Sequence, residues 1–208
     1  MRSLFLTFIV LFSSAPATLG ETRCGKPASE IELTVHVYDY ASVPNEILVE
    51  GEGEASKIFQ PAEIRLLWAK SPLVGTPANA ITPTSPTPRR PSAVLKILPE
   101  YRVEPLHRAQ RELGFTIPGT SFIFFDRVRT ASPILPIGAV LGYVVAHELG
   151  HLLGLHHSAG LMSESVPPAW LLRGRRVFGF TGEQEKEMAN TLNAGLLGDV
   201  TRHVSSCR

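Results

Sequence analysis

Residues 147–157 constrain this chain more than any other stretch, because they have the pattern H-E-x-x-H-x-x-G-x-x-H. His147 and His151 are four residues apart, so on a helix they share one face and can offer two imidazole nitrogens to one metal ion. Glu148 can reach a water molecule on that ion without being a ligand itself. Gly154 can end the helix, because glycine adopts left-handed φ without strain, and the chain can then return His157 as a third ligand. Three protein ligands with one open position are typical of catalytic zinc, whereas structural zinc has four.

The alternative is a buried apolar helix whose histidines only satisfy hydrogen bonds in the core. The pattern fixes five positions, and about 200 starting points give a chance expectation on the order of 10⁻⁴. We therefore predict a zinc site, with Glu148 as the general base.

Length and charge limit the classes of protein to consider. The chain has 208 residues and a formal net charge of +1. That length is sufficient for one domain with a sizeable core. A nucleic-acid-binding protein usually has a basic surplus, and this chain has none. We therefore expect no nucleic-acid partner.

The first twenty residues have the features of a secretory signal peptide. Arg2 supplies the positive charge, residues 4–12 are apolar but too short to span a bilayer, and Ala15-Pro16-Ala17 offers a cleavage site. We therefore divide the chain into a signal peptide at 1–20 and one domain at 21–208. The mature protein is expected to be secreted or periplasmic, monomeric and without a membrane partner.

Hydrophobic periodicity predicts the order of the elements. Strands are expected at residues 31–40, 63–69, 93–98 and 121–129, and helices at about 45–59, 105–113, 139–153 and 182–196. Residues 75–92 are rich in proline and threonine and predict a loop. Thr181 and Gln184 form a capping box at the start of the last helix, where Met188 and Leu192 share one packing face.

With these residues in view, the chain resembles the metzincins, a clan of zinc endopeptidases, and is most similar to their matrixin-like and secreted bacterial members. The element order agrees over most of residues 31–197, and the specific part is residues 147–162. The resemblance implies an α+β, zincin-like fold. Its core would be a twisted mixed sheet of about four to five strands, with a buried zinc-binding helix and a C-terminal helix.

The resemblance also implies roles for single residues. His147, His151 and His157 would bind Zn²⁺, Glu148 would act as the base, and Met162 would form the methionine turn beneath the metal. A peptide or protein substrate would lie extended along an edge strand, for which residues 120–129 are the candidate. Residues 163–168 would form part of the pocket wall.

Two questions stay open at this level. Only four residues separate His157 from Met162, so the adjacent His156 is an alternative third ligand, although the spacing from Gly154 favours His157. The second question concerns Cys24 and Cys207, the two cysteines of the chain. In an oxidising compartment they are expected to form one disulfide. The alternative is that Cys24, in a stretch resembling the cysteine switch of matrixin propeptides, blocks the metal.

Three other functions compete with a soluble endopeptidase. The apolar stretch at 134–155 would suit an intramembrane metalloprotease, but such enzymes need several membrane spans. A non-catalytic zinc module would have its open position blocked, for example by Cys24 or His156. A zinc hydrolase acting on a substrate other than a peptide would share all of the same residues.

Overall fold

The computed structural model describes residues 30–70, 91–100, 112–131, 135–164 and 179–195. The elements are β1 (Ile31–Asp39), α1 (Asn45–Phe59), η1 (Gln60–Ala62), β2 (Ile64–Lys70), β3 (Ser92–Leu98), β4 (Gly114–Ile117), β5 (Thr120–Phe124), α2 (Phe125–Ala131), α3 (Ile137–Leu152), η5 (Gly160–Met162) and α5 (Gly182–Asn193). The signal peptide, Cys24, Cys207 and almost all of the helix expected at 105–113 and of the loop expected at 75–92 lie outside the described residues. Residues 112 and 113 are described, and they are not helical.

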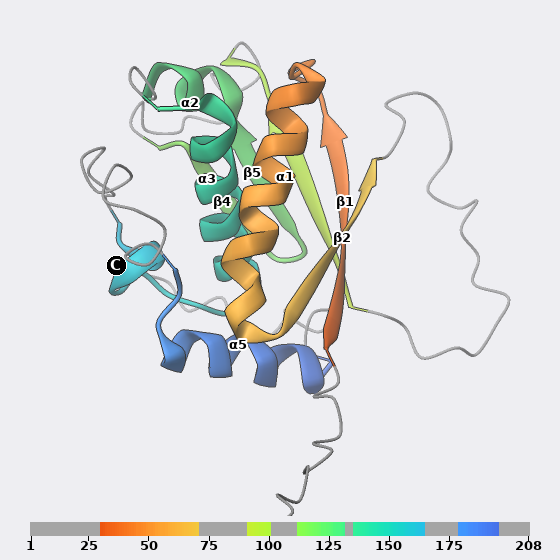
Figure 1. Ribbon diagram of the computed structural model, residues 1–208, viewed down its shortest axis with the longest axis vertical. Coiled ribbons are helices and arrows are strands. Elements are labelled where there is room, and N and C mark those ends of the chain that lie inside the picture. The colour runs from red at the N-terminus through yellow and green to blue at the C-terminus, as the bar shows by residue number, and fades with distance from the viewer. Residues whose placement is uncertain (1–29, 71–90, 101–111, 132–134, 165–178, 196–208) are drawn as a thin grey trace, which may run out of the picture.

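The five strands form one twisted mixed sheet in the order β2-β1-β3-β5-β4 (Figure 1). β1 runs parallel to both β2 and β3, and β3 runs parallel to β5. β4 runs antiparallel to β5 at the edge of the sheet. The expected α+β fold, with a mixed sheet of four to five strands, a buried helix that carries the histidines and a C-terminal helix, is therefore confirmed.

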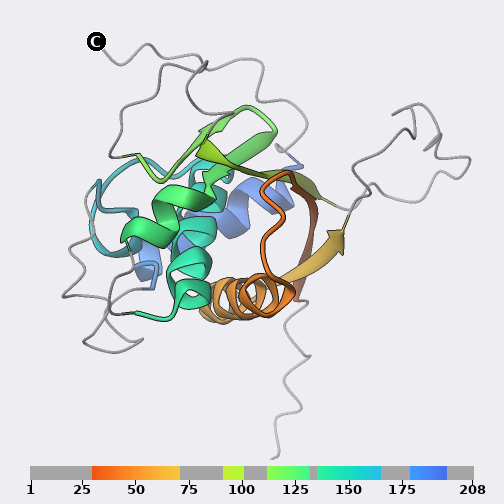
Figure 2. The same cartoon turned by 90° about the horizontal axis from the view of Figure 1, so that it is seen from above.

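The core lies between this sheet and helices α1 and α3, which run side by side over the sheet (Figures 1 and 2). Side chains alternate between the faces of a strand, and in β1 the buried positions are Leu33, Val35 and Val37. These three valine and leucine side chains pack in the same cluster as Leu141, Val145 and Leu149 of α3. The sheet therefore supports the helix that carries the histidine motif.

Helix α3 approaches α1 closely because glycines line the contact. A Cβ on Gly142 would lie 2.6 Å from Glu54 Cβ and 2.8 Å from the Gly51 carbonyl oxygen. A Cβ on Gly51 would in turn lie 3.1 Å from the Leu141 side chain. Backbone meets backbone at this contact, so neither helix has room for a larger residue.

Two alanine substitutions on these helices should change stability in opposite directions. Gly142→Ala is expected to lower the free energy of unfolding by about 1–3 kcal/mol, because the new methyl group meets backbone atoms of α1 that cannot move aside. Gly53→Ala in α1 meets nothing within 4 Å and should raise it by roughly 0.5–1 kcal/mol through helix propensity. Urea denaturation of both variants measures the difference. Equal effects of the same sign would contradict the close helix contact.

The strand predicted at residues 121–129 is wrong in its second half, because the chain turns into helix α2 after Phe124. Phe125 and Val128 are buried and three residues apart, which is a helical spacing. Arg127 of α2 forms a salt bridge with Glu100 at 3.1 Å and donates a hydrogen bond to the Glu112 carbonyl at 3.0 Å. These contacts hold the segment against the chain that precedes β4.

The expected substrate edge at 120–129 is also wrong. β5 pairs with β3 on one side and with β4 on the other, so it lies inside the sheet. The edge strand beside α3 is β4, which the sequence analysis did not predict.

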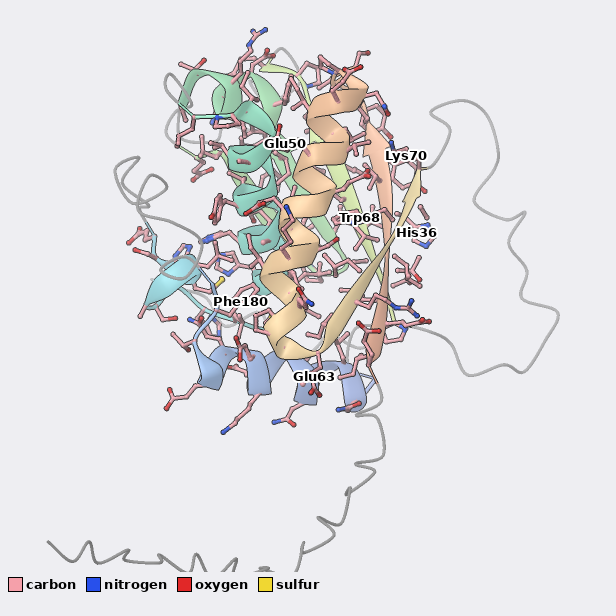
Figure 3. All side chains as sticks on the ribbon, in the orientation of Figure 1. His36, Glu50, Glu63, Trp68, Lys70 and Phe180 are labelled. Carbon is pink, nitrogen blue, oxygen red and sulfur yellow. The ribbon has the colours of Figure 1, made fainter. Side chains whose placement is uncertain are left out.

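Helix α5 crosses the end of the α1–α3 layer (Figure 1). Its capping box is present as predicted, with the Thr181 hydroxyl accepting from the Gln184 backbone N–H. Met188 and Leu192 are buried, which confirms their packing role. Phe180 lies between α5 and the ends of α1 and α3 (Figure 3) and meets the Phe59 ring edge-on, with the ring centroids 5.0 Å apart. In the described part of the chain, no helix combines the length and the apolarity needed to cross a membrane.

Candidate metal centre

Helix α3 ends in a turn that returns the chain toward the histidines on its last two turns. Gly154 has a φ of +97°, in the region that glycine occupies without a Cβ clash. The Leu155 N–H donates to the Gly150 carbonyl at 3.0 Å, and the Gly154 N–H donates to the His151 carbonyl at 3.0 Å. This pair of hydrogen bonds is a Schellman motif, and it confirms the predicted use of Gly154.

Backbone carbonyls beyond this turn fix the two helical imidazoles. The Nδ1–H of His151 donates to the Leu155 carbonyl oxygen at 2.8 Å, and the Nδ1–H of His147 donates to the Leu161 carbonyl oxygen at 2.8 Å. A carbonyl oxygen can only accept, so the ring proton of each neutral histidine lies on Nδ1. The Nε2 atom of each ring is left with a free lone pair, which is the form that binds a metal.

The three motif histidines converge through their Nε2 atoms. The Nε2 atom of His151 lies 3.1 Å from that of His147 and 3.1 Å from that of His157. The ligand nitrogens of all three lie within 4.8 Å of one another. The Nε2 atoms of His147 and His151 cannot hydrogen-bond to each other, since neither atom holds a proton. Tetrahedral zinc with Zn–N bonds of 2.0–2.1 Å places its ligand nitrogens about 3.3–3.4 Å apart. The cluster is therefore suited to holding a metal ion.

The surroundings favour the neutral form of the His147 and His151 rings. Burial lowers the pKa of His151 to about 4, against the hydrogen bond to Leu155, which raises it. Burial also lowers the pKa of His147, with a smaller contribution in the same direction from His157. Imidazole ligands suit zinc, copper, iron and nickel, and a set of three histidine ligands leaves a fourth position open, as in catalytic zinc sites.

The two candidates for the third ligand are placed differently. The ring of His157 belongs to the cluster with His147 and His151. His156 is exposed and, among the described residues, is not part of that cluster, although it is near enough to contribute to the lowered pKa of His151. The structure therefore brings together the ligand set that the spacing favoured.

Met162 is fully buried at the end of η5, directly beside the histidine helix. A Cβ on Gly150 would lie 2.7 Å from its sulfur atom, so the missing side chain at 150 makes room for it. The Met162 carbonyl accepts a hydrogen bond from the Ser158 N–H at 2.9 Å. The tight turn expected between His157 and Met162 is thus closed by its own backbone, and it presents the Leu161 carbonyl to His147.

Helix α5 holds the segment that carries His157. The side-chain amide of Gln184 donates to Ser158 Oγ at 2.8 Å and to the Ala159 carbonyl at 3.1 Å, and its oxygen accepts from the Thr181 N–H at 2.8 Å. Gln184 is buried. Gln184 of the capping box therefore also anchors the segment that carries His157. The sequence analysis missed this contact, because spacing along the chain does not show what the Gln184 amide nitrogen contacts.

Glu148 is buried against strand β4, with 5% of its surface exposed. The Thr116 hydroxyl donates to Glu148 Oε2 at 2.8 Å, and the Ser121 hydroxyl donates to the Glu148 carbonyl at 3.1 Å. A Cβ on Gly114 would lie 2.9 Å from Glu148 Oε1. Among the described residues, the three-histidine cluster does not include Glu148.

A signal for β4 was present in the sequence. Pro118 and Gly119 separate two segments of strand-forming residues, and a Pro-Gly pair indicates a two-residue turn. In the structure Gly119 has a φ of +79°, and Ile117 pairs with Thr120 across the turn. Of the expected pocket wall at 163–168, the structure describes Ser163 and Glu164 alone.

Comparisons with known proteins give a distant structural likeness. No protein-family model and no curated protein matches the sequence. Among solved structures, the chain is similar to archaemetzincin from Methanopyrus kandleri, with a TM-score of 0.45 and 14% sequence identity. The likeness covers 81% of this chain and 99% of that one.

Proposed function

We propose that this protein is an exported, zinc-dependent endopeptidase with a matrixin-like metal centre. The observation that carries the proposal is the convergence of His147, His151 and His157 on one point, with the Nε2 lone pairs of the two helical rings turned toward it. The Nε2 atoms of His147 and His151 carry no proton and lie 3.1 Å apart, so they repel one another unless a cation lies between them.

Zinc at this position would supply Lewis-acid activation of a water molecule and of the scissile carbonyl. Glu148 takes the proton of the attacking water and delivers it to the leaving amine. Its burial keeps bulk water away from the carboxylate, and its contact with β4 fixes the side chain of the base. An aspartate at this position would be one methylene too short for the same reach.

The substrate in this proposal is a peptide or protein that lies extended along β4. In the described sheet, β4 pairs with β5 on one side, and its other edge remains for a peptide strand. Backbone hydrogen bonds to an exposed edge give affinity for extended peptides largely irrespective of sequence. β4 carries the residues that touch Glu148, so a peptide paired there would run beside the base.

Export, quaternary state and cysteine chemistry complete the proposal. Residues 1–20 would direct export, and the mature chain would act as a secreted or periplasmic monomer. Cys24 and Cys207 would form a disulfide in that oxidising compartment. The competing role for Cys24, as a thiolate on the open metal position, predicts activation by alkylation of a reduced protein.

The test is proteolysis of an unstructured protein by the purified mature chain. We expect cleavage with zinc present, complete loss of cleavage after dialysis against a chelator, and recovery on adding zinc back, because the chemistry depends on the ion. Mass spectrometry of the products locates the cut bonds. Activity that survives metal removal would overturn the zinc mechanism. A zinc-loaded chain that cuts no peptide but hydrolyses an ester or amide in a substrate screen would favour the non-peptide hydrolase instead.

A further inference from the structure

We propose that Thr116, on edge strand β4, is a positioning residue that sets the direction of the Glu148 carboxylate. The inference rests on the proposed function, in which Glu148 is the general base. Thr116 is not part of the histidine motif. It comes from a strand more than thirty residues earlier in the chain, and it reaches the base from the side of the sheet.

The hydroxyl groups of Thr116 and Ser121 form a small hydrogen-bond network with Glu148. Thr116 Oγ1 lies 2.8 Å from Glu148 Oε2 and 2.9 Å from the Glu148 carbonyl oxygen. Ser121 Oγ lies 3.1 Å from the same carbonyl and 3.0 Å from Thr116 Oγ1. A carboxylate and a carbonyl can only accept. One arrangement satisfies both of these acceptors: Ser121 donates to the carbonyl, and Thr116 donates to the carboxylate.

Gly114 is the second β4 residue that contacts the Glu148 carboxylate. It lies two positions before Thr116, so both face the same side of β4. A Cβ at 114 would lie 2.9 Å from Oε1 and 3.0 Å from Cγ of Glu148. The bare backbone thus confines one carboxylate oxygen while the Thr116 hydroxyl holds the other, and the side chain is left with few alternative rotamers.

These contacts with Thr116 and Gly114 matter because a general base works only when it points at the proton that it removes. A misplacement of about 1 Å can cost on the order of 100-fold in rate. Without the Thr116 hydroxyl, the carboxylate would lose a charge-assisted hydrogen bond and could rotate. We therefore expect Thr116→Val to lower kcat by about 10–100-fold with little change in KM.

The experiment compares three variants of the full mature chain loaded with zinc. Thr116→Val removes the hydroxyl at nearly constant volume, and Thr116→Ser keeps the hydroxyl. Thr34→Val makes the same exchange in β1, where Thr34 alternates with the buried Leu33 and Val35 and so faces away from the helices. Peptide kinetics give kcat and KM, a competing chelator gives zinc affinity, and thermal unfolding gives stability.

We expect kcat to fall in Thr116→Val alone. The zinc affinity of this variant should match that of the wild type, and its stability should match that of Thr34→Val. Thr116→Ser should have a near-normal kcat. Full activity of Thr116→Val would overturn the positioning role while leaving the proposed function intact. A parallel loss of zinc affinity or of stability would reduce Thr116 to a structural residue and also overturn it. A wild-type chain that binds zinc but cleaves no peptide would instead overturn the proposed function itself.

Discussion

Replacing Glu148 with glutamine is expected to lower kcat for peptide cleavage by about 10³-fold, within the range of 10²–10⁴ that general acid–base catalysis contributes. Glutamine has nearly the same shape, and its side-chain oxygen can still accept the hydrogen bond that Thr116 donates to Glu148. An amide cannot take a proton from water at neutral pH, so only the chemistry should be lost. Steady-state kinetics on an unstructured protein or a quenched peptide measure the effect.

The same variant should keep its metal and its fold. Glu148 lies outside the cluster formed by the three histidines, so zinc affinity in a chelator competition should match that of the wild type. Glu187→Gln, on an exposed position of α5, is the matched control and should change neither quantity. If Glu148→Gln cleaves as fast as the wild type, Glu148 is not the base. If it loses zinc, Glu148 serves the metal site rather than proton transfer.

Local signals predicted the parts of this site that depend on neighbours in the sequence. The i, i+4 histidines share a helix face because the helix period requires it, and Gly154 ends that helix because only glycine adopts its φ without strain. The capping box formed as expected. In each case the interaction joins residues at most six positions apart, so spacing alone carries the information.

The parts that sequence reasoning missed depend on contacts between distant segments. The contact of Thr116 with Glu148 joins residues thirty-two positions apart, and the contact of Gln184 with Ser158 joins residues twenty-six apart. Residue types and spacing do not encode such pairings. The error at residues 121–129 has a different cause, because a strand and a short helix follow one another there without a break, and the aromatic residues obscure the change of period.

The glycine spacing of α3 shows how one segment serves both fold and site. Gly142 lets α3 lie against α1, and Gly150, two turns later, makes room for Met162. His147 and His151 lie on either side of Gly150 in the same helix. The packing that buries the helix therefore also fixes where these two metal ligands lie. The first half of α3 is therefore apolar, and the polar histidine site comes at its end.

Alanine substitution of the two adjacent histidines should separate the third ligand from its neighbour. His157→Ala is expected to weaken zinc binding at least about 100-fold and to abolish cleavage, since two nitrogens remain where catalytic zinc needs three protein ligands. His156→Ala removes the same atoms from the next position, but the ring of His156 is exposed and lies outside the cluster. It should therefore retain zinc and most of the activity.

Zinc affinity measured against a chromogenic chelator, with metal content after dialysis, gives the comparison directly. Because the two variants differ by one position in the same exposed segment, a general disturbance of the turn would affect both. Such a disturbance would also appear as a change in unfolding temperature, since Gln184 ties Ser158 to α5 just beyond these residues. If His156→Ala loses the metal and His157→Ala keeps it, then the chain completes its site with His156, and the turn after Gly154 must differ in the zinc-loaded protein. If both keep it with equal affinity, two histidines suffice, and the case for a catalytic three-histidine centre fails.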